Sequence, residues 1–187
     1  MRLIIGLGNP GEKFIATRHN IGREIVIAAQ KKFLLKSFTP NAKLAALVAE
    51  GKIGQEKIVL LLPETFMNKS GGAAGPATRF FKVKLPNIIV VHDDADILLG
   101  AAKLSFGKNS GGHKGVESVM RALKSKKFWR MRIGVQKKRR VPSEDLVLQK
   151  FRNGELAVAK KAIKKSIKAI ETIAASGPER AMNEYNA

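Results

Sequence analysis

The chain has 187 residues, of which 35 are lysine or arginine and 15 are aspartate or glutamate, so its formal charge is +20. Such a charge attracts polyanions, with nucleic acid or an anionic membrane surface as candidates, while 44% hydrophobic residues exclude a disordered or fibrous protein. The absence of cysteine excludes disulfides and thiolate metal sites or nucleophiles.

The length suits one well-filled core, and the sequence has no evident linker, so we expect a single domain over residues 1–187. No apolar run approaches the roughly 18 to 20 residues needed to cross a bilayer. The first residues also lack the apolar segment and cleavage site of a secretory signal. The sequence therefore predicts a cytoplasmic protein with no membrane partner.

The first third of the chain alternates strand-like and helical patterns. Residues 3–7 predict a strand that ends in a glycine-rich turn, and residues 21–33 have helical spacing, with Asn20 as the N-cap. Two further strands are predicted over 44–53 and 56–62. The second of them is apolar on both faces and is therefore expected at the centre of the sheet.

The pattern continues to the C-terminus. We expect helices at 73–81, 116–123 and 155–175, strands at 87–91, 103–106 and 131–135, a loop at 107–115 and a basic, lid-like segment at 136–154. An acidic run, residues 93–96, is expected just after the 87–91 strand, and Gly177 and Pro178 end the last helix. Such alternation predicts an α/β fold, a three-layer sandwich with a twisted mixed, mostly parallel sheet flanked by helices.

Three familiar kinds of site fit the sequence poorly. The glycines of Gly6-x-Gly8-x-x-Gly11 follow a strand as in dinucleotide-binding folds, but the next helical pattern begins about ten residues too late to hold a pyrophosphate. A metal site at the three histidines is a lesser alternative, because no pair has HxH or HxxxH spacing. No serine lies in a G-x-S-x-G turn. We therefore expect no cofactor and no metal.

A histidine, a group of carboxylates and several side-chain amides remain as candidates for chemistry. A neutral imidazole held by a carboxylate can take a proton from water, because the carboxylate stabilises the imidazolium that forms. Amides can orient a substrate without adding charge. This combination favours a hydrolase that uses a histidine and an aspartate on an anionic substrate.

Five motifs resemble, in order and spacing, those of bacterial-type peptidyl-tRNA hydrolases: G-L-G-N-P-G (6–11), T-R-H-N-I-G (17–22), P-E-T-F-M-N-K-S-G (63–71), H-D-D-A-D-I-L-L-G (92–100) and S-G-G-H-K-G-V-E-S (110–118). The resemblance covers essentially the whole chain. It implies a monomeric α/β enzyme that cleaves the ester between a peptide and the 3′ ribose of tRNA. The implied partner is peptidyl-tRNA, contacted at the tRNA acceptor end.

The resemblance also implies a role for individual residues. It makes His19 the general base that activates water and Asp93 the carboxylate that orients this histidine. The implied peptide-binding residues are Asn9, Phe66, Met67, Asn68, Lys114 and His113, which belongs to a mobile loop over 107–115. Lys103 and Arg132 are implied to contact the tRNA phosphates.

Two positions depart from the family pattern. Lys114 stands where asparagine is typical, and as a longer cation it can stabilise an oxyanion or repel a protonated histidine. Ser105 stands where a basic phosphate contact is common, and Lys108 or the basic run 137–140 could supply that charge. The alternative hypothesis is an RNA-binding family member whose catalysis Lys114 has weakened. The presence of both His19 and Asp93 favours the enzyme.

Overall fold

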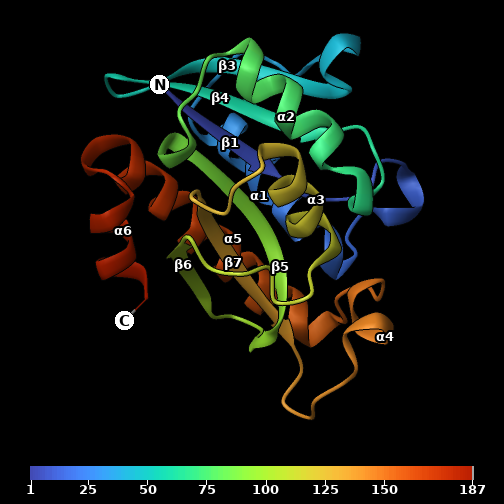
Figure 1. Ribbon diagram of the computed structural model, residues 1–187. Coiled ribbons are helices and arrows are strands. Elements are labelled where there is room, and N and C mark those ends of the chain that lie inside the picture. The colour runs from blue at the N-terminus through green and yellow to red at the C-terminus, as the bar shows by residue number, and fades with distance from the viewer. Residues whose placement is uncertain (187) are drawn as a thin grey trace.

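A seven-stranded sheet forms the middle layer of the protein in a computed structural model that describes residues 1–186 (Figure 1). Its strands are β1 (Arg2–Gly6), β2 (Thr39–Asn41), β3 (Ala46–Ile53), β4 (Glu56–Pro63), β5 (Ile88–Leu98), β6 (Ala102–Phe106) and β7 (Trp129–Gln136). The spatial order is β2-β3-β4-β1-β5-β7-β6. Residue 187, the last of the expected domain, lies outside the described residues.

The sheet is mixed, as expected. The four central strands β4, β1, β5 and β7 pair in parallel, while antiparallel pairing adds β3 and β2 at one edge and β6 at the other. Parallel and antiparallel pairings are therefore equally frequent, with the parallel ones in the middle. Strands covered on both faces must be apolar throughout, as β1 and β4 are.

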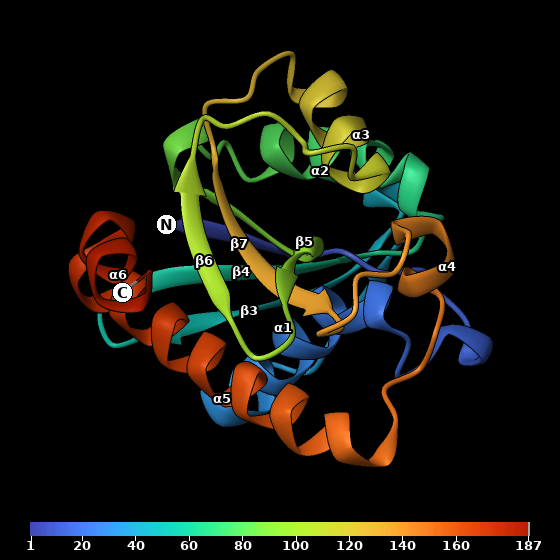
Figure 2. The same ribbon diagram turned by 90° about the horizontal axis from the view of Figure 1, so that it is seen from below.

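Helices cover both faces of the sheet (Figure 2). The helices are α1 (Ile21–Lys32), α2 (Gly71–Phe80), α3 (Lys114–Leu123), α4 (Ser143–Val147), α5 (Asn153–Ser176) and α6 (Pro178–Tyr185). Short 3-10 helices lie in the connections at Glu12–Phe14, Arg18–Asn20, Ala42–Leu44, Met67–Lys69 and Leu85–Asn87. α1 and α5 pack on one face, α2 and α3 on the other, and α6 packs beside β6. This is the expected three-layer α/β sandwich.

Alternation along the strands divides the core into two clusters. In β1, Ile4 points to the α1 and α5 side, whereas Leu3 and Ile5 point to the α2 and α3 side. β4 does the same with Leu60 and Leu61, which are fully buried on opposite faces. The prediction that the 56–62 strand is central is confirmed.

α5 is the longest helix and is amphipathic, as predicted. Its Ala162 and Ile170 are buried against the sheet side, while Lys160, Lys164 and Lys168 are exposed. None of the helices within residues 1–186 combines the length and apolarity that a bilayer crossing needs.

Several predicted boundaries were wrong. The acidic run 93–96 lies within β5, because the strand runs on to Leu98 beside β7. α3 begins at Lys114 rather than at 116, so its first two residues leave the expected 107–115 loop. β2, α4 and α6 are further elements, which the sequence pattern did not predict. The bounds of these elements depend on pairing with a distant strand or on packing against the sheet, and a local sequence pattern does not show such contacts.

The start of α1 touches β5 at Gly22. A Cβ atom on this glycine would lie 2.2 Å from the carbonyl oxygen of Val91. We expect Gly22→Ala to lower the free energy of unfolding by about 1–3 kcal/mol, because the helix must move off the strand. Urea denaturation measures this change.

Gly72→Ala in α2 is the matched control, since a Cβ there meets no atom within 4 Å. Alanine is the better helix former, so this variant is expected to gain about 0.5–1 kcal/mol. Equal stability of the two variants would contradict the close approach of α1 and β5.

Candidate active site

A cleft of about 870 Å³ lies beside the carboxyl ends of β1 and β5 and is lined by Asn9, which follows β1, and by Asp93 of β5. The segment between β7 and α5, which includes α4, forms one wall of it, at the lower right in Figure 1. The cleft contains His19 and Asp93 together with all six residues for which the resemblance implies peptide binding, namely Asn9, Phe66, Met67, Asn68, His113 and Lys114. Tertiary folding therefore gathers residues from five separate motifs at one place.

The Asp93 carboxylate is the centre of the cluster. It lies on β5 with its side chain 1% exposed, and its Oδ1 atom is 2.8 Å from His19 Nδ1 and 2.8 Å from His113 Nε2. His19 belongs to the 3-10 helix before α1, and His113 is the N-cap residue of α3. Two elements from different parts of the chain therefore meet at a single oxygen atom.

Hydrogen-bond partners assign the protons of both rings. His113 Nδ1 accepts from the backbone N–H groups of Gly115 (3.1 Å) and Val116 (3.3 Å), so its ring proton is on Nε2 and is donated to Asp93. An ionised carboxylate only accepts, so His19 also donates from Nδ1. Neutral His19 therefore has an unprotonated Nε2, the form that can act as a base.

The environment of Asp93 keeps its carboxyl group ionised. Burial alone would raise its pKa, but attraction to His113 and His19, together with the hydrogen bonds from their rings, outweighs burial and holds the pKa well below its usual range. The carboxylate therefore keeps its charge at neutral pH. A charge of that sign is what stabilises an imidazolium on His19.

His92 lies beside this cluster and contacts two of its members. Its side chain is fully buried, its Nδ1 donates to the Asp93 carbonyl oxygen at 2.6 Å, and its ring packs edge-on against His113 with 4.7 Å between centroids. Burial and the neighbouring His113 hold the pKa of His92 well below its usual range, so the ring is neutral. The three histidines thus have different surroundings.

His19, Asp93 and His113 also have the composition of a metal site, since one ligand atom from each lies within 4.8 Å of the others. The donor set does not fit a divalent ion. A metal on His113 Nε2 would leave the ring proton on Nδ1, where two backbone N–H groups already point. The geometry favours a hydrogen-bonded triad.

Two asparagines fix the opposite side of the cleft. Asn9 Oδ1 accepts from the Met67 backbone N–H at 2.8 Å, so the Asn9 NH2 group is free to donate into the cleft. Asn20 holds Asn9 in place, because its Oδ1 accepts from Asn9 N at 2.8 Å and its Nδ2 donates to Asn9 O at 2.9 Å. Asn9 is thereby orientated before any substrate binds.

Asn20 was expected to be the N-cap residue of α1, and the structure places it at that position. Its side chain makes no capping bond there and instead binds Asn9. The structure therefore adds Asn20 to the site as a supporting residue. The sequence shows an amide directly beside His19, but it does not show that this amide is buried, which is what indicates a supporting role.

The remaining cleft residues provide both apolar surface and charge. Phe66 is 56% exposed and Leu148, across the cleft, is also 56% exposed, whereas Met67 is buried beside His113. Gly115 permits this packing, because a Cβ there would lie 2.4 Å from the Met67 sulfur. Lys114, the first residue of α3, is exposed at the cleft.

A second cleft, of about 580 Å³, adjoins the first at Ser110 and Gly111. Lys103 and Arg132 line it as cross-strand neighbours on β6 and β7. They lie outside the first cleft. Arg132 donates from Nε to Asp94 Oδ2 at 2.7 Å.

Arg130 forms the floor of this second cleft. It is 3% exposed and donates to the Asn109 carbonyl at 2.7 Å, which ties the 107–113 loop to β7. Burial, and repulsion from Arg132, lower the pKa of Arg130 to about 10, so it stays positive at neutral pH. Ser105 lies opposite Arg130 in the strand pairing.

The structure separates the residues expected to compensate for Ser105. Lys108 lines the second cleft, together with Lys103. Arg140, from the basic run 137–140, lines the first cleft instead and binds Asp96 at 2.6 Å. Lys108 is therefore the compensating residue that the geometry favours.

Comparisons with known proteins agree with the fold. A family model described as Peptidyl-tRNA hydrolase matches residues 3–187. The peptidyl-tRNA hydrolases of Thermoanaerobacter sp. (strain X514) and Anaeromyxobacter sp. (strain K) are 40% and 38% identical to this chain, with 100% of this chain covered and 100% and 96% of those relatives. A crystal structure of peptidyl-tRNA hydrolase from Acinetobacter baumannii is 30% identical, with a TM-score of 0.92 over 100% of this chain and 95% of that one. The predicted resemblance and fold class are confirmed.

The lowered pKa of Asp93 predicts a pH-dependent contribution to stability. Its stabilising effect is present above the unfolded-state value of about 3.9 and is lost as the pH falls towards the lower, folded-state value. We expect Asp93→Asn to be less stable than the wild type in urea at pH 7. The difference in free energy of unfolding between the two proteins should decrease between pH 4 and pH 2. A difference that stays constant over that range would contradict the assignment.

Proposed function

The chain belongs to the peptidyl-tRNA hydrolase family and hydrolyses the ester bond of peptidyl-tRNA, and we propose that it does so with His19 as general base, orientated by Asp93. The observation that carries this proposal is the 2.8 Å hydrogen bond from His19 Nδ1 to a buried, ionised carboxylate. It leaves His19 Nε2 free towards the cleft as an acceptor for a proton from water.

The reaction then proceeds by direct attack of water. His19 Nε2 takes a proton as the water oxygen bonds to the ester carbonyl carbon, and Asp93 stabilises the imidazolium. When the carbon–oxygen bond to the ribose breaks, the same proton passes to the 3′ oxygen of the tRNA. Asn9, which presents its NH2 group, and Asn68 bind the peptide main chain beside the ester.

Lys114 and the start of α3 add positive charge to this cleft. Lys114 is the first residue of α3, so the ammonium group and the partial positive charge of the helix N-terminus act on the same region. Both stabilise negative charge that develops on the ester oxygen. We therefore assign Lys114 to the oxyanion side of the reaction, in place of the asparagine that the family typically has.

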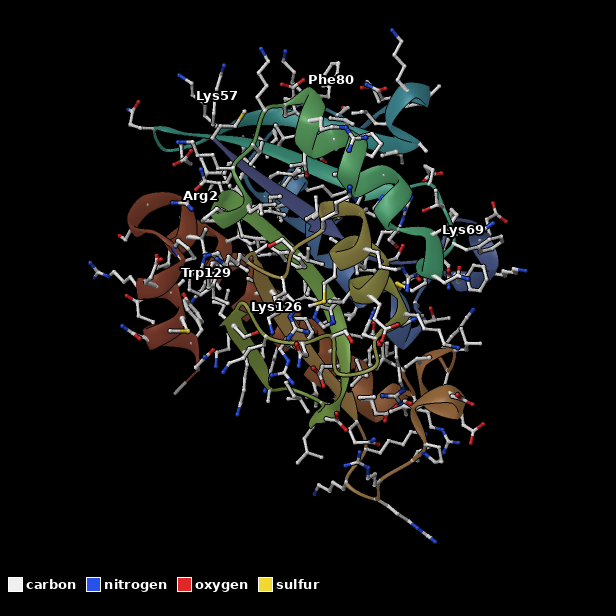
Figure 3. The ribbon with its side chains drawn as sticks, in the orientation of Figure 1. Arg2, Lys57, Lys69, Phe80, Lys126 and Trp129 are labelled. Carbon is white, nitrogen blue, oxygen red and sulfur yellow. The ribbon has the colours of Figure 1, made fainter. Side chains whose placement is uncertain are left out.

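The second cleft is suited to the tRNA backbone. Lys103, Lys108, Arg130 and Arg132 line it, and it meets the peptide cleft at residues 110–111, so a phosphate bound there is next to the reacting ester. Other basic residues are dispersed: the labelled Lys57, Lys69 and Lys126 lie well apart in Figure 3. Their charge attracts tRNA from a distance, whereas the cleft fixes its position.

Two segments complete the proposal. The 107–113 loop, tied to Arg130 at Asn109, and the lid-like segment between β7 and α5 both line the cleft and are the parts that close over a peptide. We propose that the protein acts as a monomer in the cytoplasm, where translation takes place, as its resemblance to the family implies.

His19→Ala tests the assigned base. We expect it to reduce kcat for N-acetylaminoacyl-tRNA by about 10²–10⁴-fold, the usual contribution of a positioned base, while affinity for uncharged tRNA stays unchanged. Release of labelled tRNA measures turnover and filter binding measures affinity. Unblocked aminoacyl-tRNA is the substrate control. A variant that retains most of the wild-type turnover would contradict the mechanism, and a wild type that binds tRNA without turnover would favour the RNA-binding alternative.

Lys103→Ala tests the second cleft. Affinity for uncharged tRNA should fall, and the slope of its logarithm against the logarithm of salt concentration should decrease by about 1, as expected for the loss of one phosphate contact. Lys57→Ala is the matched control, because Lys57 is exposed and lines neither cleft. If both variants change the slope equally, the second cleft does not hold a phosphate.

A further inference from the structure

Arg18, directly before His19 in the chain, is a charged residue with no exposed surface. Its Nη1 donates to the Val135 carbonyl at 3.0 Å and its Nη2 to Glu155 Oε2 at 2.6 Å. The guanidinium also lies over the Phe151 ring, 4.8 Å from its centroid. A buried charge is unfavourable unless it is paired, so these partners must stay in place for the turn to keep its shape.

The backbone around Arg18 is bound to the same distant segment. Arg18 N donates to the Gln149 carbonyl at 3.0 Å, and Thr17 forms an antiparallel bridge with Lys150. α4 packs against the 3-10 helix Arg18–Asn20. The turn that carries the base is thus joined by backbone and side chain to residues 149–155.

Those residues continue the cleft wall, defined here as residues 141–148, whose Val141, Pro142, Ser143, Glu144, Val147 and Leu148 line the cleft. At its start the wall is held by Gln136, whose side chain binds both the N–H (3.1 Å) and the carbonyl (3.0 Å) of Val141. At its end it is held by Arg18 through Gln149 and Glu155. Glu155 also accepts from Arg152 N at 2.8 Å, which closes the first turn of α5.

Three consecutive residues therefore contact three parts of the site. Arg18 holds Gln149 and Glu155, just beyond the end of the cleft wall. His19 holds Asp93, and Asn20 holds Asn9. A 3-10 helix has three residues per turn, so successive side chains point in three directions about its axis. A rotation of this one turn would move all three contacts together.

We propose that Arg18 is a positioning residue, which joins the end of the cleft wall to the turn with His19 through Gln149 and Glu155. Because of this connection, a peptide that binds against the wall also fixes the orientation of His19. This inference rests on the proposed hydrolysis by His19. Arg18 does not touch the substrate; it acts through the turn. The rigid link means that a peptide which presses the wall closed also holds His19 Nε2 at the water.

Glu155→Gln tests the link, because glutamine keeps the size of the side chain and removes the charge that pairs with Arg18. We expect kcat for N-acetylaminoacyl-tRNA to fall about tenfold, as a small misplacement of a catalytic group does. We also expect the ¹⁵N spectrum of the histidine rings to show His19 losing its pure Nδ1–H form. Arg18→Lys, which keeps the charge but loses one of the two hydrogen bonds, should fall between this variant and the wild type.

Two controls separate positioning from stability. Ile53→Val, in β3 and away from the cleft, lowers stability but should leave kcat and the His19 signal unchanged. Arg180→Gln breaks an exposed ion pair with Glu184 on α6 and should change neither. All measurements are made well below the melting temperature of each variant.

The proposal is overturned if Glu155→Gln and Arg18→Lys lower the melting temperature while kcat, KM and the His19 spectrum match the wild type. Arg18 would then be only structural. Failure of the proposed function is distinguishable, because it is seen as absent hydrolysis by the wild type, whereas the His19 spectrum reports on the link without any turnover.

Discussion

The site depends on one oxygen atom, Asp93 Oδ1, which accepts hydrogen bonds from both His19 and His113 at 2.8 Å. Each ring has a reason to donate: His113 because its other nitrogen caps α3, and His19 because the carboxylate can only accept. The shared acceptor therefore fixes two protonation patterns at once. One of them leaves a free imidazole nitrogen at the cleft, which is the requirement for a base.

The sheet makes this arrangement rigid. Asp93 lies on β5, where it is paired with Ile133 of β7, just beyond the point at which β1 stops pairing with β5 at Val91. Helices also pack against β5, so the carboxylate has little freedom to move. Gly22 lets α1 touch the same strand and so brings the turn with His19 close to it. Backbone contacts thus place the reactive groups, and side-chain hydrogen bonds only refine their direction.

Charge is divided between two neighbouring clefts. The first has apolar walls at Phe66 and Leu148 around a buried carboxylate, and the second has four basic side chains on β6, β7 and the adjoining loop. The two parts of a peptidyl-tRNA differ correspondingly, because the peptide is largely uncharged and the RNA is a polyanion. The two clefts meet at residues 110–111, which is where the proposed function puts the change from peptide to tRNA.

The sequence by itself determined the α/β class, the central apolar strands and, through five motifs, the family and the candidate residues, because periodicity and motif order are local properties. Only the tertiary structure decided that residues 74 and 20 positions from Asp93 share its oxygen, that β5 continues through the acidic run, and that the Asn20 side chain binds Asn9 instead of making a capping bond. It also decided which basic residues share a cleft. These features follow from pairing and burial between distant segments, which no local pattern specifies.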